Sequence, residues 1–309
     1  MAFFQFGPII KARREELGLS QEDLADGICS VPTLSRIENG ERLPTKNHFE
    51  MLMQRLGYSA MSMDFFTDKK DFLIYELKFK TRQAFMNEDF SRANILLDEL
   101  EAILDNPTEI DRQFILVHRI LYGEKELPHE EKLKQLETAI QLTCPKYKHN
   151  YIPRVLSYEE IIILNNIAIC YNALGDRDRT ISILTELKEY YDRHVISVEE
   201  ALRTQPMILY NLSKVLGLSG RYDECIEICD QGIRLARVSG RCPSLANTLF
   251  NRAWSLLKRN QAGDQEAAEI SMRQAYHVSD AMGETEDAEF IRNYYLQAFS
   301  KDIKHDITE

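Results

Sequence analysis

The sequence predicts an all-α protein with two domains, a compact domain of short helices over residues 1–66 and a longer array of helical pairs over residues 67–309. Three observations predict this fold. The chain has only 13 glycines and 9 prolines, and no segment alternates apolar with polar residues for long enough to indicate a strand. Helix-capping residues precede short apolar stripes in the first domain. In the second domain, a pattern of helix, glycine-containing turn and helix recurs every 40–45 residues.

The charge is acidic and unevenly distributed along the chain. There are 38 Lys and Arg against 49 Asp and Glu, a net charge of −11. Residues 1–66 carry seven basic against nine acidic residues, a net of −2, and the remainder carries 31 against 40, a net of −9. This balance excludes one broad basic surface, so contact with a polyanion requires a local patch. The first domain offers Lys11, Arg13, Arg14, Arg36, Arg42 and Lys46 for such a patch.

No apolar run reaches the length of about 18 residues that indicates a membrane span. The first residues lack the basic start and long apolar stretch of a signal peptide. We therefore expect a cytoplasmic protein without membrane contact.

The first domain begins with two helices. Ile9, Ile10 and Leu17 give the first helix an apolar stripe that ends at Gly18. Ser20 is placed to cap the second helix, and Asp23 can reach back to it as a short capping box. The inward residues of the second helix are Leu24, Ala25 and Ile28.

A third helix follows the N-cap Ser30, with Pro32 in its first turn, where the missing N–H costs little. Leu34 and Ile37 point into the core, so the intervening polar residues point elsewhere. The pair Asn39-Gly40 ends this helix. A fourth helix follows Pro44-Thr45 and ends at Gly57, and its inward residues are Phe49, Leu52, Met53 and Leu56.

This pattern resembles the phage-repressor-like helix-turn-helix (XRE) family, through Leu19-Ser20-Gln21, Leu24-Ala25, Ser30, Thr33 to Glu38, and Gly40. The resemblance implies that the third helix enters the major groove of double-stranded DNA. It implies a phosphate contact for Gln21 and base reading for Arg36, which is suited to bidentate contact with guanine. An alternative is that Arg36 contacts only phosphate. The full predicted DNA-binding set is Gln21, Val31, Pro32, Thr33, Ser35, Arg36, Arg42 and Lys46.

The start of the third helix differs from that of a helix that makes many hydrogen bonds to bases. Val31 and Pro32, at the first two groove positions, carry no hydrogen-bonding side chain. They can offer only apolar contact, for example to thymine methyl groups. We therefore expect sparse base readout, with more of the specificity left to DNA shape or half-site spacing.

The second domain contains three similar segments. Asn166 to Asp176 is followed by the helix Ile181 to Tyr191, and Asn211 to Tyr222 by the helix Cys225 to Ala236. The third runs from Asn251 to Asp264 and continues with Ala267 to Val278. Residues 79–104 are an earlier, degenerate copy. Because each unit can bury its apolar stripes only against its neighbours, the pattern predicts an α-solenoid with a concave face.

The units resemble tetratricopeptide repeats, which carry an aromatic or apolar residue four before a turn glycine. Tyr171 before Gly175 and Leu216 before Gly220 fit this hallmark. The spacing is longer than the standard repeat of about 34 residues, which indicates longer helices. Five units and a C-terminal helix over residues 286–299 would fill the domain.

A concave helical surface can hold an extended peptide, whose backbone needs both donors and acceptors. Asn supplies both, and Asn166, Asn211 and Asn251 recur at similar places with spacings of 45 and 40 residues. We predict that they form a ladder, with Arg252 as a partner for a carboxylate. The alternative is that these Asn side chains only cap or join helices. The other predicted peptide-binding residues are Asn165, Asn247, Tyr210 and Ile169.

Together the domains resemble the peptide-sensing quorum regulators of Gram-positive bacteria (the Rap–Rgg–NprR–PlcR–PrgX family). The segments Asp26 to Ser30 and Gly40 to Pro44 look most like the Rgg and PlcR branch. The resemblance implies a homodimeric transcription factor that binds an inverted-repeat operator and is controlled by a short linear peptide. Tyr58 to Lys70 would be the linker that transmits the signal. The alternative is a peptide-independent repressor whose repeats serve only dimerisation or docking of a protein partner.

The sequence gives no support for an enzyme. It contains no GxGxxG, phosphate-loop or HExxH motif, and His129-Glu130-Glu131 lacks the second His of a zinc site. The six cysteines fit no zinc-ligand spacing. We expect no cofactor and no metal. Cys225 and Cys229, four apart on a predicted helix, are expected to be small buried residues, with redox sensing or metal binding as the alternative.

Overall fold

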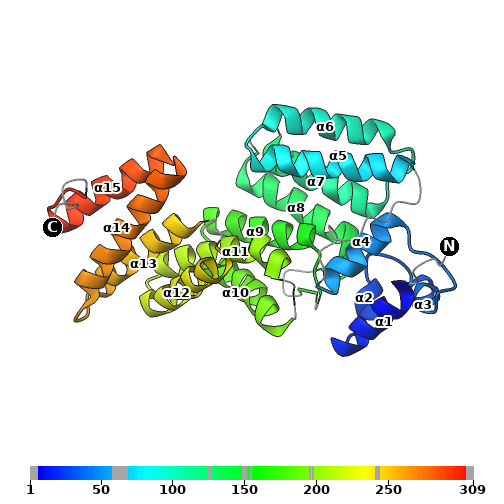
Figure 1. Ribbon diagram of the computed structural model, residues 1–309, viewed down its shortest axis with the longest axis horizontal. Helices are drawn as coiled ribbons and strands as arrows, with labels where there is room; N and C mark the ends of the chain where they lie inside the picture. The colour runs from blue at the N-terminus through cyan, green and yellow to red at the C-terminus, as the bar shows by residue number, and fades with distance from the viewer. Residues whose placement is uncertain are drawn as a thin grey trace. The chain divides into compact units, whose positions relative to one another are not determined.

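The computed structural model describes most of the chain, and every regular element in the part that it describes is a helix (Figure 1). This confirms the prediction of an all-α fold. The described residues are 6–57, 69–123, 127–147, 152–153, 155–194, 196, 198–240 and 244–303.

The chain divides into two compact units. The first comprises Met1–Leu174 and Tyr190–Glu200, and the second comprises Gly175–Glu189 and Ala201–Glu309. The predicted boundary near residue 66, and most of the proposed linker from Tyr58 to Lys70, lie outside the described residues. The N-terminal helices therefore share a compact unit with the first helices of the repeat array, which the sequence did not indicate.

Four short helices open the first unit, and the predicted caps of the second and third helices form. The Ser20 side chain accepts a hydrogen bond from the Asp23 N–H, and Asp23 reaches back to complete the capping box. Ser30 and Thr45 likewise cap the third and fourth helices. Such caps are each worth roughly 0.5–2 kcal/mol. The helices are α1 (Phe6–Glu16), α2 (Gln21–Ala25), α3 (Val31–Glu38) and α4 (Lys46–Arg55).

The apolar core of these four helices is close to the predicted one, but it extends beyond them. Leu34 and Ile37 of α3 are almost fully buried, as expected. Ile110 and Val155, from later in the chain, belong to the same cluster. The core therefore fastens the N-terminal helices to the helices that follow. Its other members from α1, α2 and α4 include Ile10, Leu24, Ala25, Phe49, Leu52 and Met53, with Leu56 just beyond α4.

The rest of the first unit is built from long helices in consecutive contact. Helix α5 packs on α6, α7 packs on α8, and α8 packs on α9. A second apolar cluster, which includes Leu77, Leu97 and Phe114, joins α5, α6 and α7. The helices are α5 (Lys69–Met86), α6 (Phe90–Ile103), α7 (Glu109–Tyr122), α8 (His129–Thr143) and α9 (Tyr158–Ala173).

The second unit continues the pattern of helical pairs. The turn glycines Gly175, Gly220 and Gly263 have φ of 89°, 77° and 84°, a left-handed conformation that explains glycine at these turns. Helices α12 to α15 pack in succession. The helices are α10 (Arg177–Arg193, whose last residues belong to the first unit), α11 (Val198–Leu218), α12 (Tyr222–Ser239), α13 (Leu245–Arg259), α14 (Asp264–Met282) and α15 (Thr285–Phe299).

In chain order, the described helices after α4 run from α5 to α15, which is the number that five helical pairs and a C-terminal helix require. None of the helices in the described ranges is long and apolar enough to cross a membrane.

Candidate functional site

The outer face of α3 is open to solvent. Leu34 and Ile37 turn inward, whereas Val31, Pro32 and Arg36 are exposed, and Thr33 and Ser35 are half-buried. Ser30, just before the helix, caps it through the Thr33 N–H. Within the described residues, the Arg36 guanidinium has no ion-pair partner. The predicted groove-facing residues therefore lie together on an accessible helix face.

A buried ion pair supports α2 and α3 from beneath. The Arg14 guanidinium donates to both oxygens of Glu38, with Nε–Oε1 and Nη2–Oε2 distances of 2.6 and 2.9 Å. The hydrogen bond to Glu38 raises the pKa of Arg14. Gln21, at the start of α2, donates its Nε2 to Glu38 Oε2 at 2.8 Å. The predicted phosphate-contacting residue is thus held by a side chain of α3.

Sequence reasoning missed the role of Glu38. It falls four residues after Leu34, on the inward face of α3, and it is 2% exposed. A carboxylate on the apolar side of an amphipathic helix requires a buried cationic partner. That position is the signal from which the pairing could have been predicted.

Half of the predicted basic patch is not at the surface, which corrects the expectation for three residues. Arg13 donates to the carbonyl of Leu56 at 3.2 Å, and Arg14 is committed to Glu38. Lys46, assigned to DNA binding from the sequence, is 7% exposed, and its Nζ lies 3.7 Å from the centre of the Tyr75 ring. Their long stems pack on the core while their charges find partners inside the protein. The exposed members of the patch are Lys11, Arg36 and Arg42.

Helix α4 is fastened to α9 by a second buried ion pair. Arg55 Nη2 lies 2.7 Å from Glu160 Oε1, and both side chains are 1% exposed or less. Arg55 Nη1 also donates to the carbonyls of Asp26 and Leu24, at 2.6 and 3.3 Å. Burial acts to raise the pKa of Glu160, but the charge and hydrogen bond of Arg55 hold that pKa below its ordinary value.

Two further contacts join the N-terminal helices to the long helices. Asn47 of α4 donates its Nδ2 to both oxygens of Asp111 at 3.0 Å, and Lys78 Nζ lies 2.8 Å from Asp111 Oδ1. A Cβ atom on Gly27 would lie 1.3 Å from the carbonyl oxygen of Thr143, at the end of α8. Only glycine permits this close approach of two backbones. None of these partners was predicted.

The predicted asparagine ladder is divided between the two units. Asn166 belongs to the first unit and donates to the carbonyl of Ile162 in its own helix at 2.9 Å. Asn211 and Asn251 belong to the second unit, where Asn251 Nδ2 donates to Ser213 Oγ at 3.0 Å. A ladder through all three residues stays a prediction. The bond from Asn251 to Ser213 joins α13 to α11, which fits the alternative that these Asn side chains join helices.

The other predicted peptide-binding residues have varied surroundings. Arg252 donates its Nε to Asp230 at 2.7 Å and its Nη1 to Ser271 at 2.6 Å, so an external carboxylate would compete with Asp230. Asn165 is buried, and Ile169 is 39% exposed. Tyr210 and Asn247 are half-buried.

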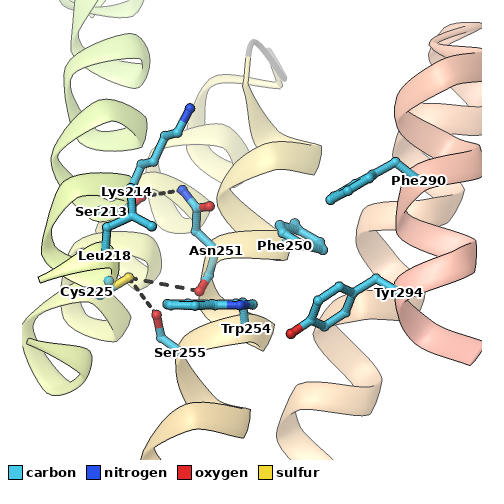
Figure 2. Close-up of a pocket in the computed structure, with 11 residues that line it drawn as sticks. Ser213, Lys214, Leu218, Cys225, Phe250, Asn251, Trp254, Ser255, Phe290 and Tyr294 are labelled. Carbon is cyan, nitrogen blue, oxygen red and sulfur yellow. Dashed lines mark hydrogen bonds between the residues drawn. The ribbon is translucent and has the colours of Figure 1, made fainter. Parts of the chain in front are cut away.

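A pocket of about 230 Å³ opens in the second unit, beside Asn251. Figure 2 shows that Phe290 and Tyr294 extend from α15 toward Phe250 and Trp254 of α13. The ring centres of Phe250 and Phe290, and of Phe250 and Tyr294, are each 5.4 Å apart. The remaining lining comes from Ser213, Lys214, Gly217 and Leu218 of α11, Cys225 of α12, and Ser255 of α13.

Cys225 and Cys229 are buried on α12, as expected, with their sulfur atoms 4.0 Å apart. Ser255 donates to Cys225 Sγ at 3.0 Å. Hydrogen bonds from Cys229 and Ser255 lower the pKa of the Cys225 thiol. Among the described residues, no group of His, Cys, Asp and Glu has the arrangement of a metal site.

Residues 10–61 match the helix-turn-helix family. The N-terminal helices α1 to α4 are therefore of helix-turn-helix type, as the sequence predicted. No curated protein matches the sequence.

Two solved structures share the fold over almost the whole chain. PlcR from Bacillus thuringiensis, in complex with the peptide PapR7 and DNA, is 18% identical, with a TM-score of 0.57, and the match covers 96% of this chain and 99% of that chain. The apo form of PlcR is 15% identical, with a TM-score of 0.58, covering 92% of this chain and 98% of that chain. The chain therefore adopts a known fold.

Proposed function

We propose that this chain is a DNA-binding transcriptional regulator whose binding to its operator is controlled by a short peptide held by the repeat helices. One observation carries the proposal. The outer face of α3 is accessible, while the neighbouring helix α4 is anchored to α9 through the buried Arg55–Glu160 pair. The helix-turn-helix domain that presents a surface suited to DNA is therefore fixed to a helix of the repeat array.

The comparisons support both halves of the proposal. The helix-turn-helix match covers the residues that form α3, and helices of this type place their recognition helix in the major groove. PlcR, which shares the fold, was solved with a peptide and DNA bound together. Regulation by peptide is thus compatible with this order of domains.

The chemistry of α3 defines the expected DNA contacts. Arg36 is exposed and can donate two hydrogen bonds to the O6 and N7 atoms of guanine. Val31 and Pro32 offer apolar contacts only. A single domain with so few base-contacting side chains gains useful affinity when two copies bind half-sites about one helical turn apart. We therefore propose a homodimer on an inverted-repeat operator.

Control by a peptide requires that it bind two arrangements of the protein with different affinities. A coupling free energy of about 1–3 kcal/mol is typical. It changes the affinity for DNA by a factor between about five and more than a hundred. The contacts of Arg55 and Asn47 give such a coupling a route to the helix-turn-helix domain, since they join α4 to α9 and α7.

The test begins with selection of bound sequences from a random duplex library by the full-length protein. We expect a symmetric consensus, and at least ten-fold weaker binding by Arg36→Ala, in line with about 1–3 kcal/mol for a bidentate base contact. Arg112→Ala, at an exposed pair with Glu109 on α7, is the matched control. Absence of any selected sequence would refute a role in DNA recognition.

The second half of the test concerns the peptide. Pools of seven-residue peptides without Trp are added to the protein and its selected duplex, and affinity is measured by fluorescence anisotropy. A shift in affinity with a subset of the pools is expected. Sequence-specific binding that no pool changes would favour the peptide-independent repressor.

A further inference from the structure

We infer that the pocket between α11, α13 and α15 receives one aromatic side chain of the controlling peptide, next to a carboxylate that pairs with Lys214. The inference rests on the proposed function and specifies which peptide chemistry the second unit recognises. It assigns to four aromatic residues and one lysine a role that the ladder prediction did not include.

The size of the pocket fits one side chain. Its volume is about 230 Å³. A dry cavity of about 150 Å³ binds benzene, whereas sites for drug-sized ligands span about 300–1,000 Å³. The space is therefore large enough for a phenyl or indole ring and too small for a whole peptide. Such a pocket acts as an anchor for one residue of an extended ligand.

The walls favour an aromatic occupant. Phe250 and Tyr294 meet edge to face, with an interplanar angle of 80°. Figure 2 shows Trp254 beside this pair and Phe290 opposite Phe250. Phe290 is 59% exposed, so the apolar surface at the mouth is incompletely covered by the protein itself. An added ring can make the edge-to-face contacts that aromatic pairs prefer.

The polar groups at the pocket supply orientation. Asn251 donates its Nδ2 to Ser213, and within the described residues its Oδ1 accepts no hydrogen bond, so it can accept one from a peptide N–H. Lys214 lies at the rim and is exposed, and its Nζ has no ion-pair partner among the described residues. In a chain of net charge −11, an unpaired cation beside an apolar pocket favours a ligand carboxylate. That carboxylate is either the peptide's C-terminus or an acidic side chain beside the aromatic residue.

Gly217 maintains the space between α11 and α13. A Cβ atom at this position would lie 3.2 Å from Ser255 Oγ and 3.3 Å from a ring carbon of Trp254. Both distances are tighter than ordinary contacts, so a larger residue at this position would require Ser255 or Trp254 to shift by a few tenths of an ångström. Glycine inside a helix makes the helix less stable than alanine would, and at this position it leaves room beside the indole.

Trp254 is the only tryptophan in the chain, so its indole N–H gives one resonance that reports on this pocket. We would titrate ¹⁵N-labelled full-length protein with N-acetylphenylalaninamide, N-acetylleucinamide and N-acetylalaninamide. The expected order of affinity is phenylalanine over leucine by about two- to ten-fold, as for an added aromatic contact, with no shift from alanine. N-acetylphenylalanine, which has a free carboxylate, should bind about two- to five-fold more tightly than its amide.

Variants assign the contacts. Lys214→Gln, at an exposed position, should abolish the preference for the free acid and leave binding of the amide unchanged. Tyr294→Ala should weaken the phenylalanine probes at least five-fold, and Leu296→Ala, an exposed residue on the same helix, should not. The dipeptides acetyl-Phe-Glu-amide and acetyl-Glu-Phe-amide, compared with N-acetylphenylalanine, distinguish a side-chain carboxylate from a C-terminal one.

The outcomes separate this inference from the proposed function. Equal shifts from all three amides, or none from the phenylalanine probes, would overturn the aromatic pocket. Peptide pools that alter DNA binding without moving the Trp254 resonance would also overturn it, while leaving peptide control intact. A third outcome is that the protein binds the phenylalanine probes but no peptide pool changes its affinity for DNA. That result would support the aromatic site and refute peptide control.

Discussion

Arg55 and Glu160 lie 105 residues apart in the sequence, and their side chains form a 2.7 Å ion pair with almost no exposure to solvent. The pair joins α4, the last helix of the helix-turn-helix domain, to α9. Removing two charges from water costs free energy that their attraction only partly returns, so such a pair is weak evidence for net stability. Its clearer consequence is a defined docking geometry, since neither charge can be buried without the other.

The first prediction concerns this pair. Arg55→Ala leaves the Glu160 carboxylate buried without its cation and should lower the free energy of unfolding by about 3–5 kcal/mol. Urea denaturation followed by circular dichroism measures the change. Arg112→Ala breaks an exposed pair whose side chains are 55% and 48% exposed, and should cost less than about 1 kcal/mol. Similar losses for the two variants would contradict the assigned role of Arg55.

The second prediction compares two glycines in the left-handed conformation. Gly18 has φ of +63° and no atom within 4 Å of an added Cβ, whereas Gly27 has φ of +70° and faces the Thr143 carbonyl. Gly18→Ala should cost about 1–2 kcal/mol from backbone strain alone. Gly27→Ala adds a clash that should force the α2–α3 turn away from α8. Hydrogen exchange should therefore increase near Thr143 only for Gly27→Ala, and unchanged exchange would exclude the close approach.

The third prediction is a dependence of stability on pH. Burial lowers the pKa of His118, whose ring stacks on Phe85 and lies tilted against Phe114 in the first unit. In the unfolded chain its pKa is about 6.5, so between that value and the lower folded pKa the unfolded state binds more protons. The contribution of neutral His118 is therefore complete above about pH 6.5 and is lost as the pH falls.

Urea unfolding from pH 7.5 to pH 5 tests this effect. His118→Phe keeps an aromatic ring in the stack but cannot be protonated, so its free energy of unfolding should fall less over this range than that of the parent. His129→Phe is the control, because His129 is an exposed residue at the start of α8. Parallel pH profiles for the parent and His118→Phe would contradict the prediction.

The fourth prediction tests the corrected basic patch and rests on the proposed function. Each phosphate contact contributes about −0.9 to the slope of log affinity against log salt concentration. Arg42→Gln, at an exposed residue beyond α3, should reduce the magnitude of that slope by about one. Lys46→Gln should leave the slope unchanged, because its ammonium lies over the Tyr75 ring. Anisotropy titrations with the selected duplex at 50–200 mM salt distinguish the two, and a reduced slope for Lys46→Gln would restore it to the DNA-binding set.

The helix-turn-helix domain could be predicted in detail because its signals are local. Ser20 and Ser30 cap the helices that follow them through bonds within three residues, and Leu34 and Ile37 define an inward face by their spacing. The repeat pattern was also visible, because turn glycines such as Gly175 and Gly220 mark the middle of each pair. Hydrogen bonds between residues close in sequence need no knowledge of the tertiary fold.

The candidate site was less predictable than the helices. In the sequence, a charged residue that faces solvent cannot be distinguished from one that pairs with a distant residue inside the protein. Lys46 and Arg14 look like surface cations in the sequence, yet they meet Tyr75 and Glu38 inside the protein. The aromatic pocket brings together residues from α11, α13 and α15, and no spacing rule connects them. The predicted ladder included Asn251, which lines this pocket, but it did not include Trp254 or Tyr294.

The sequence by itself determined the helices, their caps and the order of the two domains, since these follow from periodicity and from bonds spanning a few residues. Only the tertiary structure decided which charges are buried, because the desolvation of Arg55 depends on Glu160, a residue 105 positions away. The same holds for the close passage of Gly27 past Thr143 and for the ring-lined pocket at Trp254. These features depend on which surfaces meet in three dimensions, and the helical periodicity of each segment is the same whatever it packs against.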